Sequence, residues 1–336
     1  MRRVLRYLGF AAFYSVALTA GLYLTLPTER AKVALETEFN ARQDGENPLT
    51  MKIGELDTYW LSGLELKDVE LTGQPTVDAD GKVGKAERYL IDAARVRASI
   101  LSAVTGGLSV GFDAEAFSGT LDGTYKAEGE SKDIRISLQD LAAGELPMLQ
   151  RTTGIPMQGT LSGEVELTLP TGKLSESEGS VELTVSGLRV ADGKTKIRDT
   201  LALPEINAGT LRLRAEIKAG SLTIQELKCD GKDITVIVEG KVRLRDPVES
   251  SLAEMTLRYQ FKDAYRSKNE MTEALLGKEG GPPGVLDLDP SVRRAKQPDG
   301  FYAWRLSGPL SKLKFDPLSG AAGRAPARQG LRNRLR

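Results

Sequence analysis

Histidine is missing from this sequence of 336 residues. Its absence excludes a Ser-His-Asp triad, an imidazole general base and the usual histidine-containing zinc sites. Cys229 is the single cysteine, so the chain can form neither an internal disulfide bond nor a cysteine-based metal cluster. We therefore expect a protein that is not an enzyme and that holds no metal and no cofactor.

Aromatic residues are also scarce, at 6% of the sequence, whereas glycine occurs 35 times and proline 15 times. This composition favours many turns and slender strands over a deep aromatic core. The apolar share of 40% argues against global disorder. The length suits one large all-β domain or two smaller ones.

The charges balance overall, with 46 basic and 46 acidic residues, but they are unevenly distributed. Residues 1–26 hold three arginines and no acid, and residues 321–336 hold five arginines and no acid. When these eight arginines are set aside, 38 basic and 46 acidic residues remain, a net charge of −8. Such a body would repel a nucleic-acid backbone, so we expect no nucleic-acid partner.

One long apolar run, "LGFAAFYSVALTAGLYLTL", covers residues 8–26. As a helix it would be about 28 Å long, close to the hydrocarbon thickness of a bilayer. A cleaved signal peptide is the alternative, but the run is longer than a typical signal core, which favours an uncleaved anchor. The arginines before it predict a cytoplasmic amino terminus. We expect a single-pass protein of a bacterial inner membrane whose main domain is periplasmic.

Three segments follow from these patterns: a cytoplasmic tip and anchor over 1–27, a β-rich periplasmic domain over 28–320, and a basic tail over 321–336. The tail has few apolar residues, so we expect it to be disordered. It could bind anionic lipid headgroups or an acidic partner, or have no partner. The candidate contacts on such a surface are Arg324, Arg328, Arg332, Arg334 and Arg336.

The body alternates apolar and polar residues, as in "GEVELTL" over 163–169 and "GTLRLRAEI" over 209–217. A period of two predicts half-buried strands, each opened by a glycine turn. Helices are expected just after Pro27 and again after Lys262 with Asp263 as the cap, a loop over 281–300, and a closing hairpin over 300–315. The predicted fold is mainly β: an elongated, curved antiparallel sheet with two or three short helices.

The stretch "WLSGLELKDVELTG" poses a problem, because Leu64 and Leu66 have one parity while Val69 and Leu71 have the other. A β-bulge near Asp68 would return all four side chains to one face; otherwise the strand is buried on both faces. These four residues are candidates for a core or an apolar groove. The further candidates, from later strands, are Val181, Leu183, Leu211, Leu213, Met255 and Leu257.

The other reactive side chains lack partners nearby in the sequence. Asp287 and Asp289 have no further ligands close by, which favours a solvated strand or turn. Ser62 and Ser307 each precede glycine and have no histidine base, so turn formation explains both. Cys229 precedes an Asp-Gly turn and fits a strand residue better than a reactive thiol.

The anchor, the helix after Pro27, "LSGLELKDVEL", the glycine-opened strands and the terminal "GFYAWRLSGPLSKLKFDP" together resemble the type II secretion system protein N family, in its version from deltaproteobacteria. The strand after Gly63 is also similar to AsmA-like bridging proteins of bacterial envelopes. The first resemblance spans Met1 to Pro317, although its motifs consist of glycines and alternation.

The two resemblances imply different roles. The first implies an accessory inner-membrane component that supports export of folded proteins across the outer membrane, with other secretion-system proteins as partners. The second implies a curved sheet whose apolar face binds or transfers lipids, with phospholipid as the partner. The residues themselves leave this choice open. On the first resemblance we expect the secretion role, with lipid binding along an apolar groove as the alternative.

Overall fold

The computed structural model describes residues 28–42, 48–60, 62–75, 86, 88–99, 102, 106–146, 149, 155–193, 196–197, 201–202, 204–277 and 281–319. The expected anchor over 8–26 and the basic tail from Arg324 lie outside these residues. Within the described ranges, no helix has both the length and the apolar character needed to cross a membrane.

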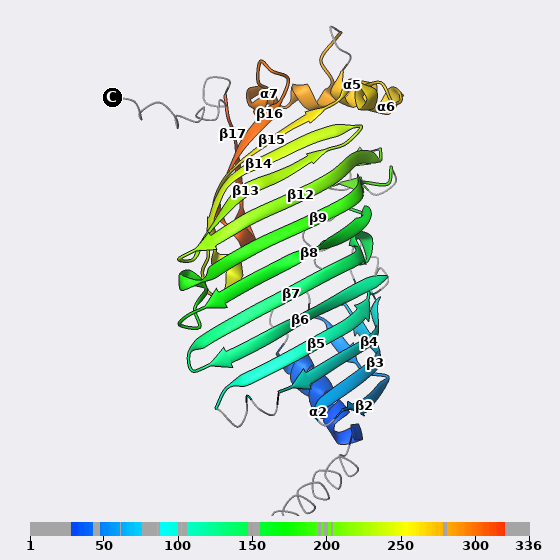
Figure 1. The fold of residues 1–336 in the computed structure, drawn as a ribbon. Helices are drawn as coiled ribbons and strands as arrows, with labels where there is room; N and C mark the ends of the chain where they lie inside the picture. Colours follow the sequence, from blue (N-terminus) through cyan, green and yellow to red (C-terminus); the bar gives the residue numbers. More distant parts are fainter. Residues whose placement is uncertain are drawn as a thin grey trace, which may run out of the picture. The chain divides into compact units, whose positions relative to one another are not determined.

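The structure is mainly β, with fifteen strands in antiparallel sheet and few helices (Figure 1). The chain divides into two compact units, one up to Gly129 and one from Glu130. The glycine-opened alternating segments of the sequence are strands, as the period of two predicts.

The first unit begins with one helix and continues with strands in the order β1-β3-β4-β5-β6, and β2 also pairs with β3. Its elements are α2 (Thr28–Ala41), β1 (Thr50–Lys52), β2 (Glu55–Tyr59), β3 (Gly63–Thr72), β4 (Arg88–Ala98), β5 (Leu108–Ala116) and β6 (Gly119–Glu128).

The second unit has the strand order β7-β8-β9-β12-β13-β14-β15-β16-β17, with β10 and β11 paired separately. Its strands are β7 (Ser131–Ala142), β8 (Met157–Leu169), β9 (Glu178–Val190), β10 (Lys196–Ile197), β11 (Leu201–Ala202), β12 (Ile206–Lys218), β13 (Ser221–Asp230), β14 (Ile234–Arg243), β15 (Leu252–Phe261), β16 (Tyr302–Pro309) and β17 (Lys314–Pro317). Its helices are α5 (Asp263–Arg266), α6 (Glu270–Leu276) and α7 (Pro290–Ala295), and its 3₁₀ turns are η1 (Ala143–Glu145), η2 (Leu174–Glu176), η3 (Val248–Ser250), η4 (Val285–Leu288) and η5 (Leu310–Lys312).

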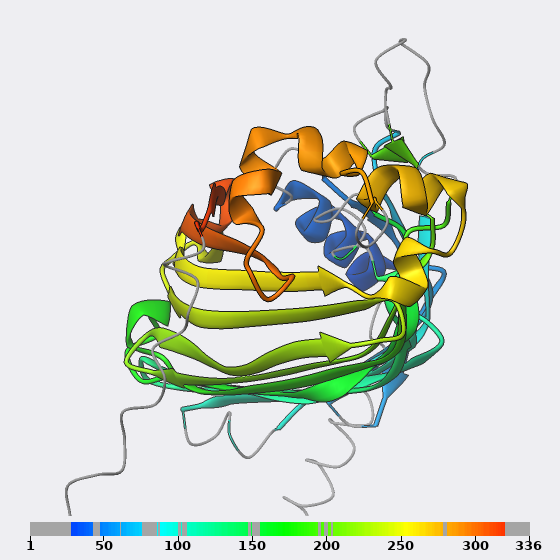
Figure 2. The same cartoon turned by 90° about the horizontal axis from the view of Figure 1, so that it is seen from above.

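Helices α5 to α7 and η4 lie between β15 and β16 in the chain and are called the cap below. Figure 2 shows the cap, in gold and orange, on the side toward which strands β12–β15 curve. Two expectations for this segment are corrected. Asp263 is the first residue of α5 rather than a cap, and Asn269 caps α6 by accepting a hydrogen bond from the Thr272 amide at 2.9 Å. The expected loop over 281–300 contains α7, which begins at Pro290. Its N-cap is Asp289, whose side chain accepts a hydrogen bond from the Ser291 amide in the first turn.

Register keeps side chains of one kind on one face of the second unit. In β12, Leu213 is partly buried while its neighbours Arg212 and Arg214 are exposed. Leu213 lies opposite Leu183 in β9 and opposite Leu227 in β13. Leu213 therefore meets apolar residues on both neighbouring strands, because directly opposed residues share a face.

Strand β3 in the first unit contains the stretch in which the apolar residues change from even to odd positions. Val69 is buried in one cluster with Ile53 and Leu56, and Leu64 and Leu66 pack against the same cluster. Side chains of both parities thus reach the same apolar side of the strand.

The change of parity occurs at Asp68 by a different route from the expected bulge. Leu66 lies opposite Ala94 and Val69 opposite Ile91, so one register holds on both sides of Asp68 and no residue is inserted relative to β4. Asp68 instead has a φ of 51°, in the left-handed region that short polar residues tolerate best after glycine. This conformation turns the following side chains back to the apolar side.

Helix α2 protects the edge formed by β1 and the start of β2. Lys32, Glu36 and Asn40 lie four residues apart, on one side of the helix. The Lys32 ammonium donates to the Gly54 carbonyl at 2.7 Å, and the Glu36 carboxylate accepts from the Ile53 amide at 2.7 Å. The Asn40 side chain accepts from the Met51 amide and donates to the Met51 carbonyl in β1. The helix therefore satisfies main-chain groups that an edge strand would otherwise expose.

Replacing Val69 by lysine should lower the free energy of unfolding by about 3 kcal/mol or more, because it would bury an unpaired charge. Leu90, on the other face of the neighbouring strand and 53% exposed, provides the control: Leu90→Lys should change stability by about 0.5 kcal/mol or less. Urea unfolding of both variants measures the difference. Equal tolerance of the two lysines would mean that Val69 does not face the core.

Candidate apolar binding surface

An apolar face runs across eight consecutive strands of the second unit, from β7 to β16. At about 4.8 Å between neighbouring strands, these eight strands span roughly 34 Å. The register aligns their apolar side chains in rows across the strands. One row crosses all eight strands in register and continues to Phe315 in β17; its members are Ile136, Val165, Val181, Ala215, Ile224, Gly240, Met255 and Leu306. A shorter row beside it joins Leu183, Leu213 and Leu227. We call this surface the apolar face.

The centre of the apolar face is only partly covered. The central residues are partly exposed on every strand, and they include Ile136, Val165, Val181, Leu183, Leu211, Leu213, Ile224, Val238, Met255 and Leu257. A sheet face packed under a second layer would bury such residues instead. Each ~40 Å² of this surface that an apolar ligand covered would contribute about 1 kcal/mol.

Both margins of the apolar face are closed. At one margin, Ile217, Val242 and Ala253 form a buried cluster near the ends of their strands. At the other margin, Ile206 packs with Tyr265, Leu275 and Leu276 of the cap. The partly exposed strip therefore lies between two dry clusters that stabilise the sheet.

Aromatic side chains gather where the apolar face reaches β15 and β16. The ring of Tyr259 stacks on Tyr302 at 5.3 Å between centroids and meets Phe261 edge-on at 5.7 Å. Phe261 in turn stacks on Tyr265 of α5 at 5.5 Å. The face is thus aliphatic from β7 to β14 and ends in rings that carry polar tips.

The cap is fastened to the sheet by buried polar contacts. The Tyr265 hydroxyl donates to the Pro204 carbonyl at 2.8 Å, and the Lys268 ammonium donates to the Glu205 carbonyl at 2.6 Å. Asp233, only 3% exposed, accepts from the Asn207 amide at 2.8 Å and from Lys268 at 3.4 Å. These bonds hold α5 against the start of β12.

A second fastening involves Asp287, which the sequence suggested was solvated. It is 9% exposed, accepts from the Tyr302 hydroxyl at 2.9 Å and pairs with the Lys296 ammonium at 2.6 Å. Asp289, by contrast, caps α7 by accepting from the Ser291 amide and hydroxyl, and these bonds lower the pKa of its carboxyl. The two acids therefore serve different structural contacts and do not form a pair.

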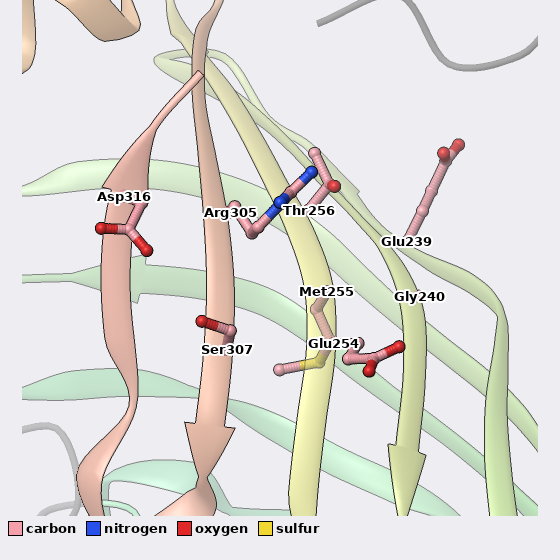
Figure 3. Close-up of a pocket in the computed structure, with 8 residues that line it drawn as sticks. All are labelled: Glu239, Gly240, Glu254, Met255, Thr256, Arg305, Ser307 and Asp316. Carbon is pink, nitrogen blue, oxygen red and sulfur yellow. The ribbon is translucent and has the colours of Figure 1, made fainter. Parts of the chain in front are cut away.

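The opposite face of the second unit is polar. Near the β17 edge, polar residues of this face and Met255 line a hollow of about 730 Å³. Figure 3 shows these side chains. The register places Thr256 opposite both Glu239 and Arg305, and Arg305 opposite Asp316. Acids, a base and hydroxyls alternate here, as on a solvated surface, and Figure 3 shows Ser307 apart from the carboxylates. The lining resembles neither an apolar pocket nor a nucleophile with its base.

The first unit also has partly exposed apolar residues on strands β5 and β6. Val110 lies opposite Tyr125, and Ala114 lies opposite Leu121. Here too the residues on this side of the strands are small or apolar, and their neighbours in sequence are charged or hydroxylic.

The candidate residues from the sequence lie as follows. Leu64, Leu66 and Val69 share the cluster of the first unit, and Leu71 lies opposite Met51, which packs against that cluster. The members on the apolar face are Val181, Leu183, Leu211, Leu213, Met255 and Leu257. The arginines of the tail lie outside the described residues. Cys229 is a buried strand residue, and burial raises the pKa of its thiol.

The phenol of Tyr302 should govern stability at high pH. Burial, followed by the hydrogen bond to Asp287 and the charge of Asp287, raises its pKa from 10.0 to about 12, and burial likewise raises the pKa of Tyr265 to about 12. A raised pKa in the folded state favours the neutral phenol. The contribution to stability is therefore complete below pH 10 and is lost as the pH rises toward 12.

Tyr302→Phe should lower the free energy of unfolding at neutral pH by about 2 kcal/mol, because Asp287 loses a donor. The variant should also lose less further stability between pH 10 and 12 than the unaltered protein. Unfolding curves measured over this pH range test both statements. Identical pH profiles would contradict the role given to Tyr302.

Asp233, Asp287 and the aromatic group were not among the candidates from the sequence. The sequence places Tyr259 near Phe261 and Tyr302 near Trp304, but the contact between Tyr259 and Tyr302 joins two distant segments and comes from the fold. Comparison of the chain with protein families, with curated proteins and with solved structures gave no match.

Proposed function

We propose that this protein binds lipid acyl chains on the apolar face of its second unit. The observation that supports this function is the row from Ile136 to Leu306, which crosses eight strands in register and leaves most of its aliphatic side chains partly exposed. A surface for protein contacts needs a few anchors, whereas a continuous aliphatic strip about 34 Å long matches extended hydrocarbon. It is longer than the roughly 15 Å that the acyl chains of one leaflet span, half of the ~30 Å hydrocarbon core of a bilayer, so an extended acyl chain fits along it.

The proposal includes the finer architecture and the location. We expect an elongated, curved, AsmA-like sheet that stands in the periplasm and is tethered by the segment over 8–26 to the inner membrane. In this location the protein would lie next to the phospholipids of the inner membrane. Its action would be binding and transfer, without catalysis and without a cofactor.

A second candidate function, that of an accessory component of the type II secretion system, is favoured by the edge strand β17. Among the described strands, β17 is the last in the order and pairs with β16 alone, and its Phe315 is 55% exposed. An open edge with an exposed aromatic residue can accept a strand from a protein partner. Together with the resemblance of the sequence, this edge supports a contact with other secretion-system proteins.

Photo-crosslinking tests the lipid function directly. A photoreactive amino acid at Leu213 or Leu257 of the full chain should form phospholipid adducts in membranes. The same residue at Arg212 or Thr256, the adjacent positions on the polar face, is the matched control and should form several-fold fewer. Mass spectrometry of the adducts identifies the lipid. Equal or absent adducts at all four positions would contradict acyl-chain binding.

Secretion of folded exoproteins from a deletion strain tests the second candidate. Lost secretion, restored by the unaltered gene but not by a variant with Phe315→Asp in β17, would support the edge contact. Normal secretion in the deletion strain would contradict the secretion role. If lipid adducts formed on the apolar face of the same protein, lipid binding would be the function that remains.

A further inference from the structure

The aromatic end of the apolar face borders a polar pocket in the cap. This pocket has a volume of about 430 Å³, within the range of small-molecule sites. Its lining includes Phe261 from the aromatic group and Leu276 from the margin cluster. Hydrocarbon bound on the face would therefore end next to polar groups, on the side where the tyrosine hydroxyls lie.

Four charged residues line this pocket, and two of them neutralise each other. Lys296 and Asp287 form an ion pair at 2.6 Å. The Arg266 guanidinium donates only to main-chain carbonyls, those of Phe261 at 3.3 Å and Leu276 at 3.4 Å. Within the described part of the chain, neither Arg266 nor Asp263 has an ion-pair partner. One cation and one carboxylate are thus left available in the same pocket.

This arrangement complements a zwitterion that carries a phosphate and a primary ammonium close together. The Arg266 guanidinium would bind the phosphate, and the Asp263 carboxylate would accept from the ammonium. A lipid with a net negative head would meet Asp263 without a cation of its own to offset that carboxylate. A quaternary ammonium head could not donate a hydrogen bond to Asp263, and among the described lining residues Phe261 alone is aromatic.

We propose that the pocket binds the phosphoethanolamine head of a phospholipid whose acyl chains extend over the apolar face from β14 toward β7. This assignment rests on the proposed acyl-chain function and adds the head group and the direction of the lipid. Tyrosine and tryptophan side chains prefer the boundary between hydrocarbon and polar groups. The Tyr302 ring stacks on Tyr259 and its hydroxyl donates to Asp287 of the pocket lining, which fits this direction.

The test uses the full chain in vesicles that contain phosphatidylethanolamine and phosphatidylglycerol in equal amounts, with the photoreactive amino acid at Leu257. When the pocket is unaltered, the adducts at Leu257 should contain about ten times more phosphatidylethanolamine than phosphatidylglycerol. Asp263→Asn should abolish the enrichment but retain the adducts, because the Asp263 side chain makes no hydrogen bond with the described residues. Arg266→Gln should reduce both lipids, and Arg266→Lys should restore part of the loss.

Two matched controls alter nearby charges outside the pocket lining. Glu270→Gln and Arg293→Gln should keep the tenfold enrichment, and thermal unfolding checks that every variant is folded. A photoreactive group at Ile136, on β7, should react with long-chain lipids but several-fold less with short-chain ones, because the head is held at the other end.

The outcomes separate the two levels of the proposal. Adducts that mirror the vesicle composition, in the unaltered protein and in Asp263→Asn alike, would overturn the head-group assignment and leave acyl-chain binding intact. Equal reaction of short and long chains at Ile136 would overturn the direction. Absence of any adduct at Leu257 would overturn the acyl-chain function itself and the pocket assignment with it.

Discussion

The register of the antiparallel strands is the constraint on which the rest of the second unit depends. A shift by one residue would exchange Leu213 with Arg212 and move every apolar side chain of that strand to the polar face. Because Leu183 and Leu227 lie opposite Leu213, one slipped strand would also set charges against leucines on both sides. Burial of the margins therefore fixes the register, and the register in turn creates the continuous apolar face.

An apolar face that is only partly covered must be stabilised elsewhere. The margin clusters supply dry packing at both ends of the strands, and buried acids fasten the cap. Asp233 and Asp287 are suited to this role because a buried carboxylate is costly unless it is paired and hydrogen-bonded, so it strongly favours one arrangement of its donors. The fastening also positions Arg266 beside the aromatic end of the face.

Much of this structure could be predicted from the sequence, because the period of two is a local signal. The strands, the apolar candidates and the closing hairpin of β16 and β17 follow from alternation and turn residues alone. The contacts of Asp287 could not be predicted, since its partner Tyr302 lies 15 residues away and the intervening segment contains α7. At Asp68, parity correctly indicated an irregularity, but it could not distinguish an inserted residue from a left-handed one.

The two candidate functions use different parts of the second unit, so one protein could perform both. Lipid binding would use the apolar face and the cap pocket, which lie on the side that the sheet encloses, whereas a protein partner would pair with the edge of β17. Phe315 lies opposite Leu306, whose neighbour Arg305 belongs to the polar hollow. A partner strand added at this edge would extend the sheet, and with it the row that ends at Phe315. Binding of a partner could thereby lengthen the apolar face, which would couple the presence of that partner to the lipid that the face can hold.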